Sequence, residues 1–198
     1  MNRRALLQSL PFFGAAVPLA ANSRSQDMFG PKARLKPAIC AYSYRKELQA
    51  KTLSYTDLVR IAVDHDIDGL DLTVYWFPNT EESFLMPLRR MAYINGVEIY
   101  SISVRTNLCQ PEAPKRQEQV REIMKWVDVA SKLGAGHIRI FGGNVPKGHT
   151  EDEAAGWCVD VLTRASDYAG KHGVILGLEN HGGITDYAKR IVEIVTRV

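Results

Sequence analysis

The 198-residue chain lacks the features that would place it in several protein classes. It has only three cysteines, Cys40, Cys109 and Cys158, and this odd, scattered set forms no disulfide framework. No Gly-x-Gly-x-x-Gly motif follows an apolar run, and no Gly-Lys-Ser/Thr phosphate loop occurs, which argues against a nucleotide-binding sheet. We therefore interpret the cysteines as small buried side chains.

Outside its first 26 residues, the chain also lacks an excess of basic or of acidic side chains. The formal net charge is +3, but residues 1–26 contain Arg3, Arg4 and Arg24 and no acidic residue. Subtracting these three from the 25 basic side chains leaves 22, against 22 acidic ones. A neutral body lacks the basic excess that binding to a phosphate backbone requires, so we expect no nucleic-acid partner.

No apolar run is long and continuous enough to span a membrane. The run from Ala5 to Ala21 is broken by two polar residues and two prolines. Together with the charged start before it, it makes residues 1–26 typical of an export signal. The adjacent Arg3-Arg4 favours the twin-arginine type over an ordinary secretory signal. We therefore expect a protein that is exported to the periplasm or secreted.

The rest of the chain alternates between strand-like and helix-like patterns. Residues 27–37 are a Gly/Pro/Lys-containing linker, and residues 38–198 form the predicted domain. Strands are predicted over 38–44, 69–76, 97–105, 137–143 and 174–180. Helices are predicted over 54–65, 82–96, 114–133, 150–171 and from 185 onwards, with N-terminal caps at Ser54 and Thr150. Five strand–helix units in strict alternation predict a parallel sheet of the α/β class.

Polar residues gather where the strands end. They are Thr73–Trp76, Arg105–Asn107, Gly142–Asn144 and Glu179–His181. This is the end at which a (β/α)₈ barrel carries its active site. The alternation of side chains along a strand predicts that Asp71, Arg139 and Glu179 point to the barrel axis. Charges inside a barrel need an opposite charge or a metal, since uncompensated burial costs several kcal/mol per ion.

One motif carries a resemblance to a known family. The stretch "GVILGLENHGG" (173–183), supported by "GLDL" and "HIRIFGG", resembles the xylose isomerase-like barrels, the sugar phosphate isomerase/epimerase family. The resemblance runs from about residue 36 to the end and implies a (β/α)₈ TIM barrel. A complete barrel needs about 250 residues. We therefore expect about five of eight βα units, an incomplete domain that is inactive unless another chain or copy completes it.

The resemblance also implies a metal site. Members of this family typically hold one divalent metal through a Glu, an Asp, a His and a second Glu. Glu179 matches the first ligand by position, and the other three would lie beyond Val198. Glu179 is thus the expected metal ligand and a catalytic residue, with Mn, Mg or Zn as the ion. The ion would polarise a sugar carbonyl while a carboxylate moves a proton between neighbouring carbons. The alternative is a structural carboxylate paired with Arg139.

Four further residues are candidates for the same site. His181 shares the inward face of Glu179 and is predicted to act in catalysis or to contact a substrate hydroxyl, although a loop histidine bonded to backbone is the alternative. Arg139 would bind a substrate oxygen or hold Glu179 in place. Trp76 would pack on a sugar ring or simply in the core. Asn180, on the opposite face, is a weaker substrate-binding candidate.

The sequence as a whole predicts a metal-dependent isomerase or epimerase of a sugar or polyol. Three alternatives remain open. The first is a dehydratase or lyase acting on a keto-inositol or dehydroshikimate type of substrate. The second is a metal-dependent DNA repair nuclease, against which the neutral body and the leader argue. The third is a non-catalytic barrel remnant that binds carbohydrate. A small sugar or polyol is the expected partner, and a homo-oligomer is compatible with the sequence.

Overall fold

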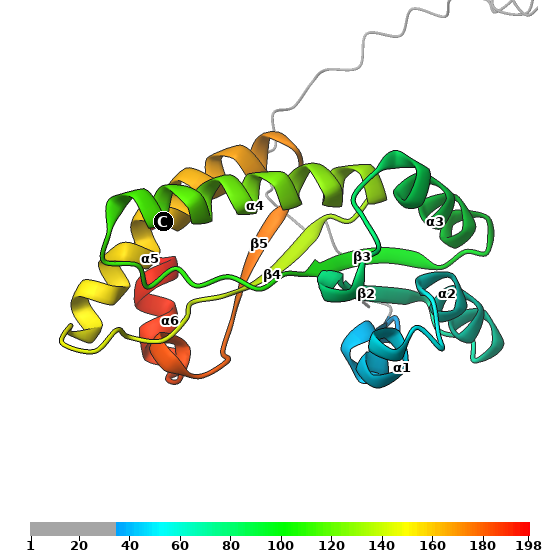
Figure 1. Ribbon diagram of the computed structural model, residues 1–198, viewed down its shortest axis with the longest axis horizontal. Coiled ribbons are helices and arrows are strands. Elements are labelled where there is room, and N and C mark those ends of the chain that lie inside the picture. Colours follow the sequence, from blue (N-terminus) through cyan, green and yellow to red (C-terminus); the bar gives the residue numbers. More distant parts are fainter. Residues whose placement is uncertain (1–34) are drawn as a thin grey trace, which may run out of the picture. The chain divides into compact units, whose positions relative to one another are not determined.

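The computed structural model describes residues 35–198. The predicted export signal and residues 27–34 of the predicted linker lie outside the described residues. Lys36–Val198 forms one compact unit with five β-strands and six α-helices (Figure 1). Within the part of the chain that is described, no helix has both the length and the apolar character needed to cross a membrane.

The five strands form one parallel sheet. They are β1 (Ala38–Cys40), β2 (Gly69–Thr73), β3 (Glu98–Ser103), β4 (His137–Phe141) and β5 (Ile175–Glu179). Their order in space is β1-β2-β3-β4-β5, with every neighbouring pair parallel. The prediction of a parallel α/β sheet is confirmed. Because all strands run in one direction, their carboxyl ends meet at one edge, where the candidate residues gather.

The α-helices alternate with the strands along the chain. They are α1 (Arg45–Ala50), α2 (Tyr55–Asp64), α3 (Glu82–Ile94), α4 (Ala113–Leu133), α5 (Glu151–Lys171) and α6 (Ala188–Val195). Helices α2 to α5 each contact one of the strands, and α4 packs along α5. Figure 1 shows these two long helices on the same side of β4 and β5. They cover one face of the sheet and leave the other to the polar residues.

Local capping explains where two helices begin. The Ser54 and Thr150 hydroxyls accept hydrogen bonds from the backbone N–H groups of Asp57 and Glu153, whose carboxylates accept in return from the cap residues. Each capping box satisfies donors that a helix start leaves unpaired. Helix α4 ends at Gly134, whose φ of 80° is a left-handed conformation that glycine adopts without strain. These predicted boundaries are confirmed.

The two faces of the sheet differ in chemistry, as the alternation of side chains predicts. The face under the helices carries fully buried apolar side chains, among them Leu70, Leu72, Ile102, Ile138 and Ile140. Each such side chain contributes about 1.5–3 kcal/mol relative to leaving it in water. The opposite face carries Asp71, His137, Arg139 and Glu179. Asp71 and His137 form hydrogen bonds with serines of β3, and Arg139 forms an ion pair with Glu179.

Two predicted strands are too long. The first ends at Cys40 and continues as a 3₁₀-helix over Ala41–Tyr44, and the second ends at Thr73 and continues as another over Val74–Trp76. Aromatic and β-branched residues favour strands, which explains the prediction, but here they lie where the chain leaves the sheet. The turns bring aromatic side chains to the mouth of the sheet.

Two other elements differ from the predicted pattern. Helix α1 was not predicted, because its six residues bury only Leu48 and so give no apolar periodicity. The last helix begins at Ala188 rather than at Thr185, since Gly183–Thr185 forms a 3₁₀-helix, and it ends at Val195 with Thr196 as its C-cap.

Candidate active site

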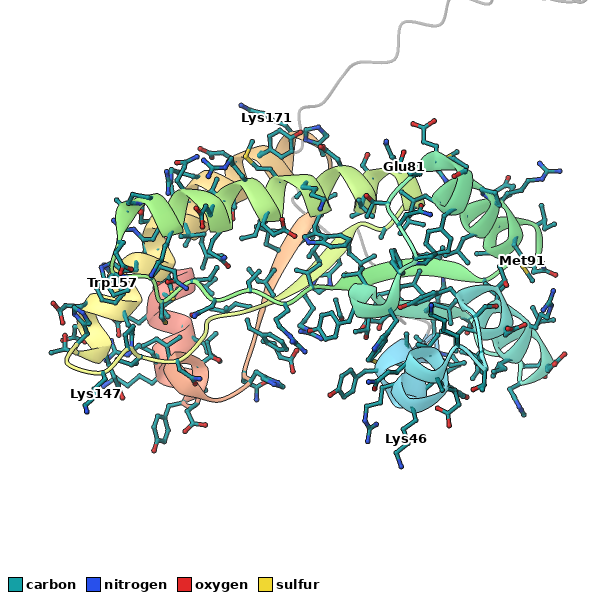
Figure 2. All side chains as sticks on the ribbon, in the orientation of Figure 1. Lys46, Glu81, Met91, Lys147, Trp157 and Lys171 are labelled. Atoms are coloured by element: carbon teal, nitrogen blue, oxygen red, sulfur yellow. The ribbon has the colours of Figure 1, made fainter. Side chains whose placement is uncertain are left out.

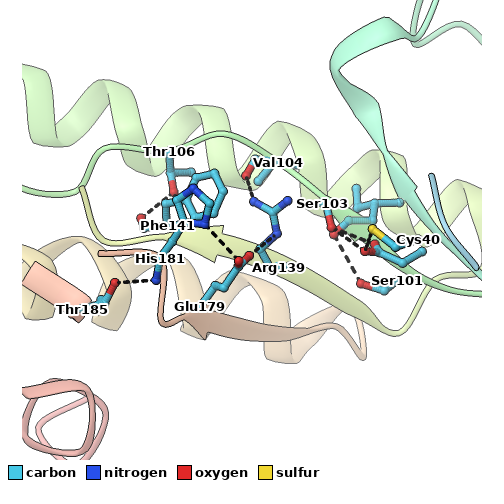
Figure 3. A network of polar contacts seen from close by, with 12 residues as sticks. Cys40, Ser101, Ser103, Val104, Thr106, Arg139, Phe141, Glu179, His181 and Thr185 are labelled. Carbon is cyan, nitrogen blue, oxygen red and sulfur yellow. Dashed lines mark hydrogen bonds and ion pairs between the residues drawn. The ribbon is translucent and has the colours of Figure 1, made fainter. Parts of the chain in front are cut away.

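Glu179 is the last residue of β5, and its carboxylate faces β4. The Arg139 guanidinium lies against it, with 2.7 Å between Arg139 Nε and Glu179 Oε2 (Figure 3). The Arg139 side chain is 17% exposed and that of Glu179 34% exposed, so the pair is partly withdrawn from water. Two oppositely charged groups from neighbouring strands thus neutralise each other on the inner face of the sheet.

His181 contacts the second oxygen of the Glu179 carboxylate. Its Nδ1 lies 3.1 Å from Glu179 Oε1, and its ring stacks on Phe141 with 4.1 Å between centroids. Its backbone N–H donates to the Thr185 hydroxyl at 3.2 Å. Ring stacking and backbone bonding together fix the imidazole in the loop after β5, so both carboxylate oxygens of Glu179 have a basic neighbour.

The guanidinium of Arg139 is held at several points. Its Nη1 donates to the Val104 carbonyl at 3.3 Å and to the Tyr75 hydroxyl at 3.4 Å. Its Cζ lies 4.1 Å from the centre of the Phe141 ring. These contacts leave the guanidinium one orientation toward Glu179. They are the contacts that a positioning role requires, and a purely structural pair would form them too.

A cavity of about 490 Å³ adjoins His181. Its lining combines Phe141 with the polar residues Arg105, Thr106, Asn107, Gln119, Asn144 and Thr185, besides two glycines. At one wall the backbone approaches so closely that a Cβ on Gly183 would lie 2.3 Å from the Gly143 carbonyl oxygen. The cavity lies beyond the carboxyl ends of β3, β4 and β5, the position at which parallel-sheet proteins bind ligands.

A second polar group lies deeper on the same face. The Ser103 hydroxyl is 2.8 Å from both oxygens of Asp71, and the Cys40 thiol is 3.4 Å from one of them. The Ser101 hydroxyl lies 2.8 Å from Nδ1 of His137. Burial lowers the pKa of His137, and the nearby Asp71 opposes this effect. Asp71 is therefore tied to its neighbours, as expected for a structural acid in a barrel.

The interpretation of all three cysteines as buried is wrong for one of them. Cys109 and Cys158 are buried, but Cys40 is exposed. Cys40 is the last residue of β1, an edge strand of the sheet, and its side chain points to the polar face beside Asp71. An edge position on that face has no helix above it to exclude water.

The described residues supply only some of the ligands that a metal site needs. Glu179 offers a carboxylate and His181 an imidazole, which are ligand types that Mn, Mg or Zn accept. Among residues 35–198, however, no three His, Cys, Asp or Glu side chains are grouped closely enough to hold an ion. An ion at Glu179 would share the carboxylate with His181 and Arg139, since each oxygen has two lone pairs, and it would need ligands from outside the described residues.

The remaining predicted site residues lie at different distances from Glu179. The Trp76 ring is 5.7 Å from the ring of Tyr75, whose hydroxyl contacts Arg139, so Trp76 lies one side chain away from the ion pair. Asn180 is exposed and does not line the cavity. The structure thus brings Glu179, Arg139 and His181 together, places Trp76 beside them and leaves Asn180 apart.

Sequence reasoning did not predict the contacts of two residues that complete this group. Tyr75 bridges Trp76 and Arg139, and Phe141 packs between the Arg139 guanidinium and the His181 ring. The inward orientation of Phe141 follows from the alternation within β4, but the His181 ring that stacks on it comes from the loop after β5.

These features define an α/β chain with the architecture of a barrel and a charged mouth at the carboxyl ends of its parallel strands. The chain belongs to the xylose isomerase-like TIM barrel family, whose model matches residues 59–198. No curated protein matches the chain significantly.

Several solved structures share the fold. D-psicose 3-epimerase from Clostridium cellulolyticum H10, solved with D-tagatose, superposes with a TM-score of 0.69 at 17% identity, covering 82% of this chain and 60% of that one. The IOLI protein with a bound zinc atom gives 0.67 at 18% identity, over 82% and 58%. The probable 3-DHS dehydratase AsbF from Bacillus anthracis gives 0.63 at 17%, over 83% and 59%. The chain therefore spans about 60% of the length of these structures, and the fold is that of a partial TIM barrel.

Proposed function

We propose that the protein containing this chain is an isomerase or epimerase of a sugar or polyol that transfers a proton next to a carbonyl group. The observation that carries the proposal is the Glu179 carboxylate, which is paired with Arg139 and with His181, the one of the three side chains that lines the polar cavity. Membership in a family whose structural relatives include an epimerase supports it. From the predicted twin-arginine-type leader we also propose that the protein works outside the cytoplasm.

The proposed chemistry assigns a role to each of the three side chains. Glu179 accepts or returns the proton on the carbon beside the carbonyl, or serves as one carboxylate ligand of a divalent metal. Arg139 holds that carboxylate in place through its bond to Oε2. His181, whose ring is fixed on Phe141, faces the cavity and donates or accepts a hydrogen bond at a substrate hydroxyl. A divalent metal, when bound, supplies polarisation of the carbonyl oxygen.

A dehydratase is the second candidate, because elimination of water begins with the same removal of a proton beside a carbonyl. Its support is the dehydratase named among the structural relatives. Identification of the product separates the two reactions, since an epimer keeps the mass of the substrate and an elimination product loses one water.

The test is an activity assay on ketohexoses and keto-inositols, with EDTA and with Mn, Mg or Zn restored. We expect turnover that EDTA removes and that Glu179→Gln lowers about 10²- to 10⁴-fold. Glu98→Gln is the matched control, since Glu98 is an exposed carboxylate at the opposite, amino-terminal end of β3. Turnover that is indifferent both to chelation and to Glu179→Gln would refute the proposal.

A further inference from the structure

A second cavity, of about 620 Å³, lies at the mouth beside the first three strands. Its lining comes from three separate segments. The segment after β1 supplies Tyr42, Arg45, Lys46 and Gln49, the turn after β2 supplies Tyr75 and Trp76, and Arg105 follows β3. All of these lie beyond the carboxyl ends of their strands, the end that carries Glu179. Arg105 also lines the cavity beside His181, so one side chain borders both cavities.

The charge of this second cavity is unbalanced. Three of its lining side chains are cationic, and no carboxylate lines it. Within residues 35–198, none of Arg45, Lys46 and Arg105 forms an ion pair with a carboxylate. Arginines elsewhere, such as Arg116 and Arg190, do form such pairs. Cations gathered without counter-charges repel one another and raise the local potential, so the cavity attracts an anion.

Two of the three cations are oriented by aromatic rings. Arg105 Cζ lies 4.7 Å from the centre of the Tyr75 ring, and Arg45 Cζ lies 5.3 Å from that of Tyr42. Arg45 Nη1 also donates a hydrogen bond to the Tyr42 carbonyl at 3.5 Å. The remaining N–H groups of the two guanidinium groups lie at the edge of each group, where they match the two oxygens of a carboxylate or phosphate. Figure 2 shows the Lys46 side chain extending from this region into open space. Trp76, with its ring centroid 5.9 Å from that of Tyr42, supplies an apolar surface beside the charges.

Direct contacts join the second cavity to the Glu179 site. The Tyr75 ring lies under Arg105, and the Tyr75 hydroxyl accepts a hydrogen bond from Arg139 at 3.4 Å. Arg139 in turn pairs with Glu179 at 2.7 Å. Two side chains, Tyr75 and Arg139, therefore lie between Arg105 and the Glu179 carboxylate, to which we assign proton transfer. Arg105 borders both cavities, so a molecule that binds beside it can extend toward His181, the hydrogen-bond partner of Glu179.

We propose that the substrate carries an anionic group, either a carboxylate or a phosphate ester, which binds at Arg45, Lys46 and Arg105. Its carbonyl end then reaches Glu179, and its carbon chain lies against Trp76. The inference rests on the proposed function and narrows the substrate from sugars in general to acidic or phosphorylated ones. Outside residues 1–26 the basic and acidic side chains are equal in number, so the excess of three cations at this cavity is a local one.

The experiment compares ligands that differ mainly in charge. Calorimetric titrations with D-fructose, D-fructose 6-phosphate and 5-keto-D-gluconate are run at low and at high salt. We expect at least one anionic ligand to bind about 10- to 100-fold more tightly than fructose, with a preference that shrinks as salt rises. The anion that binds more tightly shows whether the site prefers a phosphate ester or a carboxylate. Inorganic phosphate is expected to compete with that anion.

The variants locate the binding. We expect Arg105→Gln, and likewise the double variant Arg45→Gln/Lys46→Gln, to lower the ratio of anion affinity to fructose affinity by about tenfold or more. Lys171→Gln is the matched control, because Lys171 lies in the last turn of α5, at the other end of β5 (Figure 2). All of these side chains are exposed, so the fold is expected to tolerate the changes. Equal binding of the three ligands, or an equal loss in Lys171→Gln, overturns the proposal.

The same ligands, together with one further variant, distinguish failure of this proposal from failure of the proposed function. Glu179→Gln is expected to abolish turnover while the preference for the anion remains. Glu179-dependent turnover of neutral ketoses with no charge preference would overturn the anion site alone. Anion binding that needs Arg105, in a protein that isomerises none of the ligands, would support the site and refute the function.

Discussion

Replacing Gly177 by alanine tests the inward face of β5, on which the placement of Glu179 depends. Gly177 lies two residues before Glu179 and so shares its face. A Cβ built on Gly177 would lie 2.2 Å from Nε2 of His137 on the neighbouring strand, far inside contact distance. The imidazole must therefore move, but its other nitrogen is held by the Ser101 hydroxyl at 2.8 Å.

The expected cost follows from these contacts. Overpacking of a filled site costs about 1–3 kcal/mol, and loss of the bond to Ser101 adds about 0.5–1.5 kcal/mol. The lower entropy of the unfolded chain offsets about 0.4–1 kcal/mol. We expect Gly177→Ala to lower the free energy of unfolding by about 0.5–4 kcal/mol.

Urea denaturation measures this change, and a second glycine provides the control. Gly156 lies inside α5, and a Cβ there would meet nothing within 4 Å. Gly156→Ala should therefore raise the free energy of unfolding by about 0.5–1 kcal/mol. Adding His137→Ala to Gly177→Ala should recover the part of the loss that comes from the clash. If both glycine variants shift the midpoint in the same direction, the inner face of β5 is open and the reasoning is wrong.

Three further predictions concern single side chains. Thr150→Ala should cost about 1 kcal/mol of unfolding free energy in urea, since it breaks the capping box with Glu153; no change would contradict the cap. Because burial lowers the pKa of His137, protonation favours the unfolded chain, so stability should fall as the pH drops below about 6.5. A pH series of melting curves should show a shallower fall for His137→Gln, and parallel curves would refute that assignment. Of the three thiols, Cys40 should react first with Ellman's reagent in the native protein, because the other two are buried; equal rates for all three thiols would contradict those buried positions.

The sequence predicts most of this fold because its strongest signals are local. The capping residues Ser54 and Thr150 and the stop at Gly134 act within one helical turn, so the chain alone identifies them. The inward parity of Arg139 and Glu179 follows from alternation within two strands and needs no tertiary information.

The parts that the sequence does not predict depend on contacts between distant segments. The 3₁₀-helices at Ala41–Tyr44 and Val74–Trp76 contain residues that favour strands. They are not strands because the sheet ends directly before each of them. The cavity lined by Arg45 and Arg105 has no sequence motif, since its residues are neighbours only after β1 and β3 align. The exposure of Cys40 likewise depends on its position at an edge of the sheet.

The central claim is that Glu179 accepts and returns a proton at the carbon beside a substrate carbonyl. Incubating the protein with ketose and keto-acid substrates in D₂O, and following deuterium at the carbon beside the carbonyl by NMR, tests it most directly. We predict metal-dependent incorporation of deuterium by the wild type and its loss in Glu179→Gln, while Glu98→Gln keeps it. Incorporation at the wild-type rate in Glu179→Gln would contradict the account.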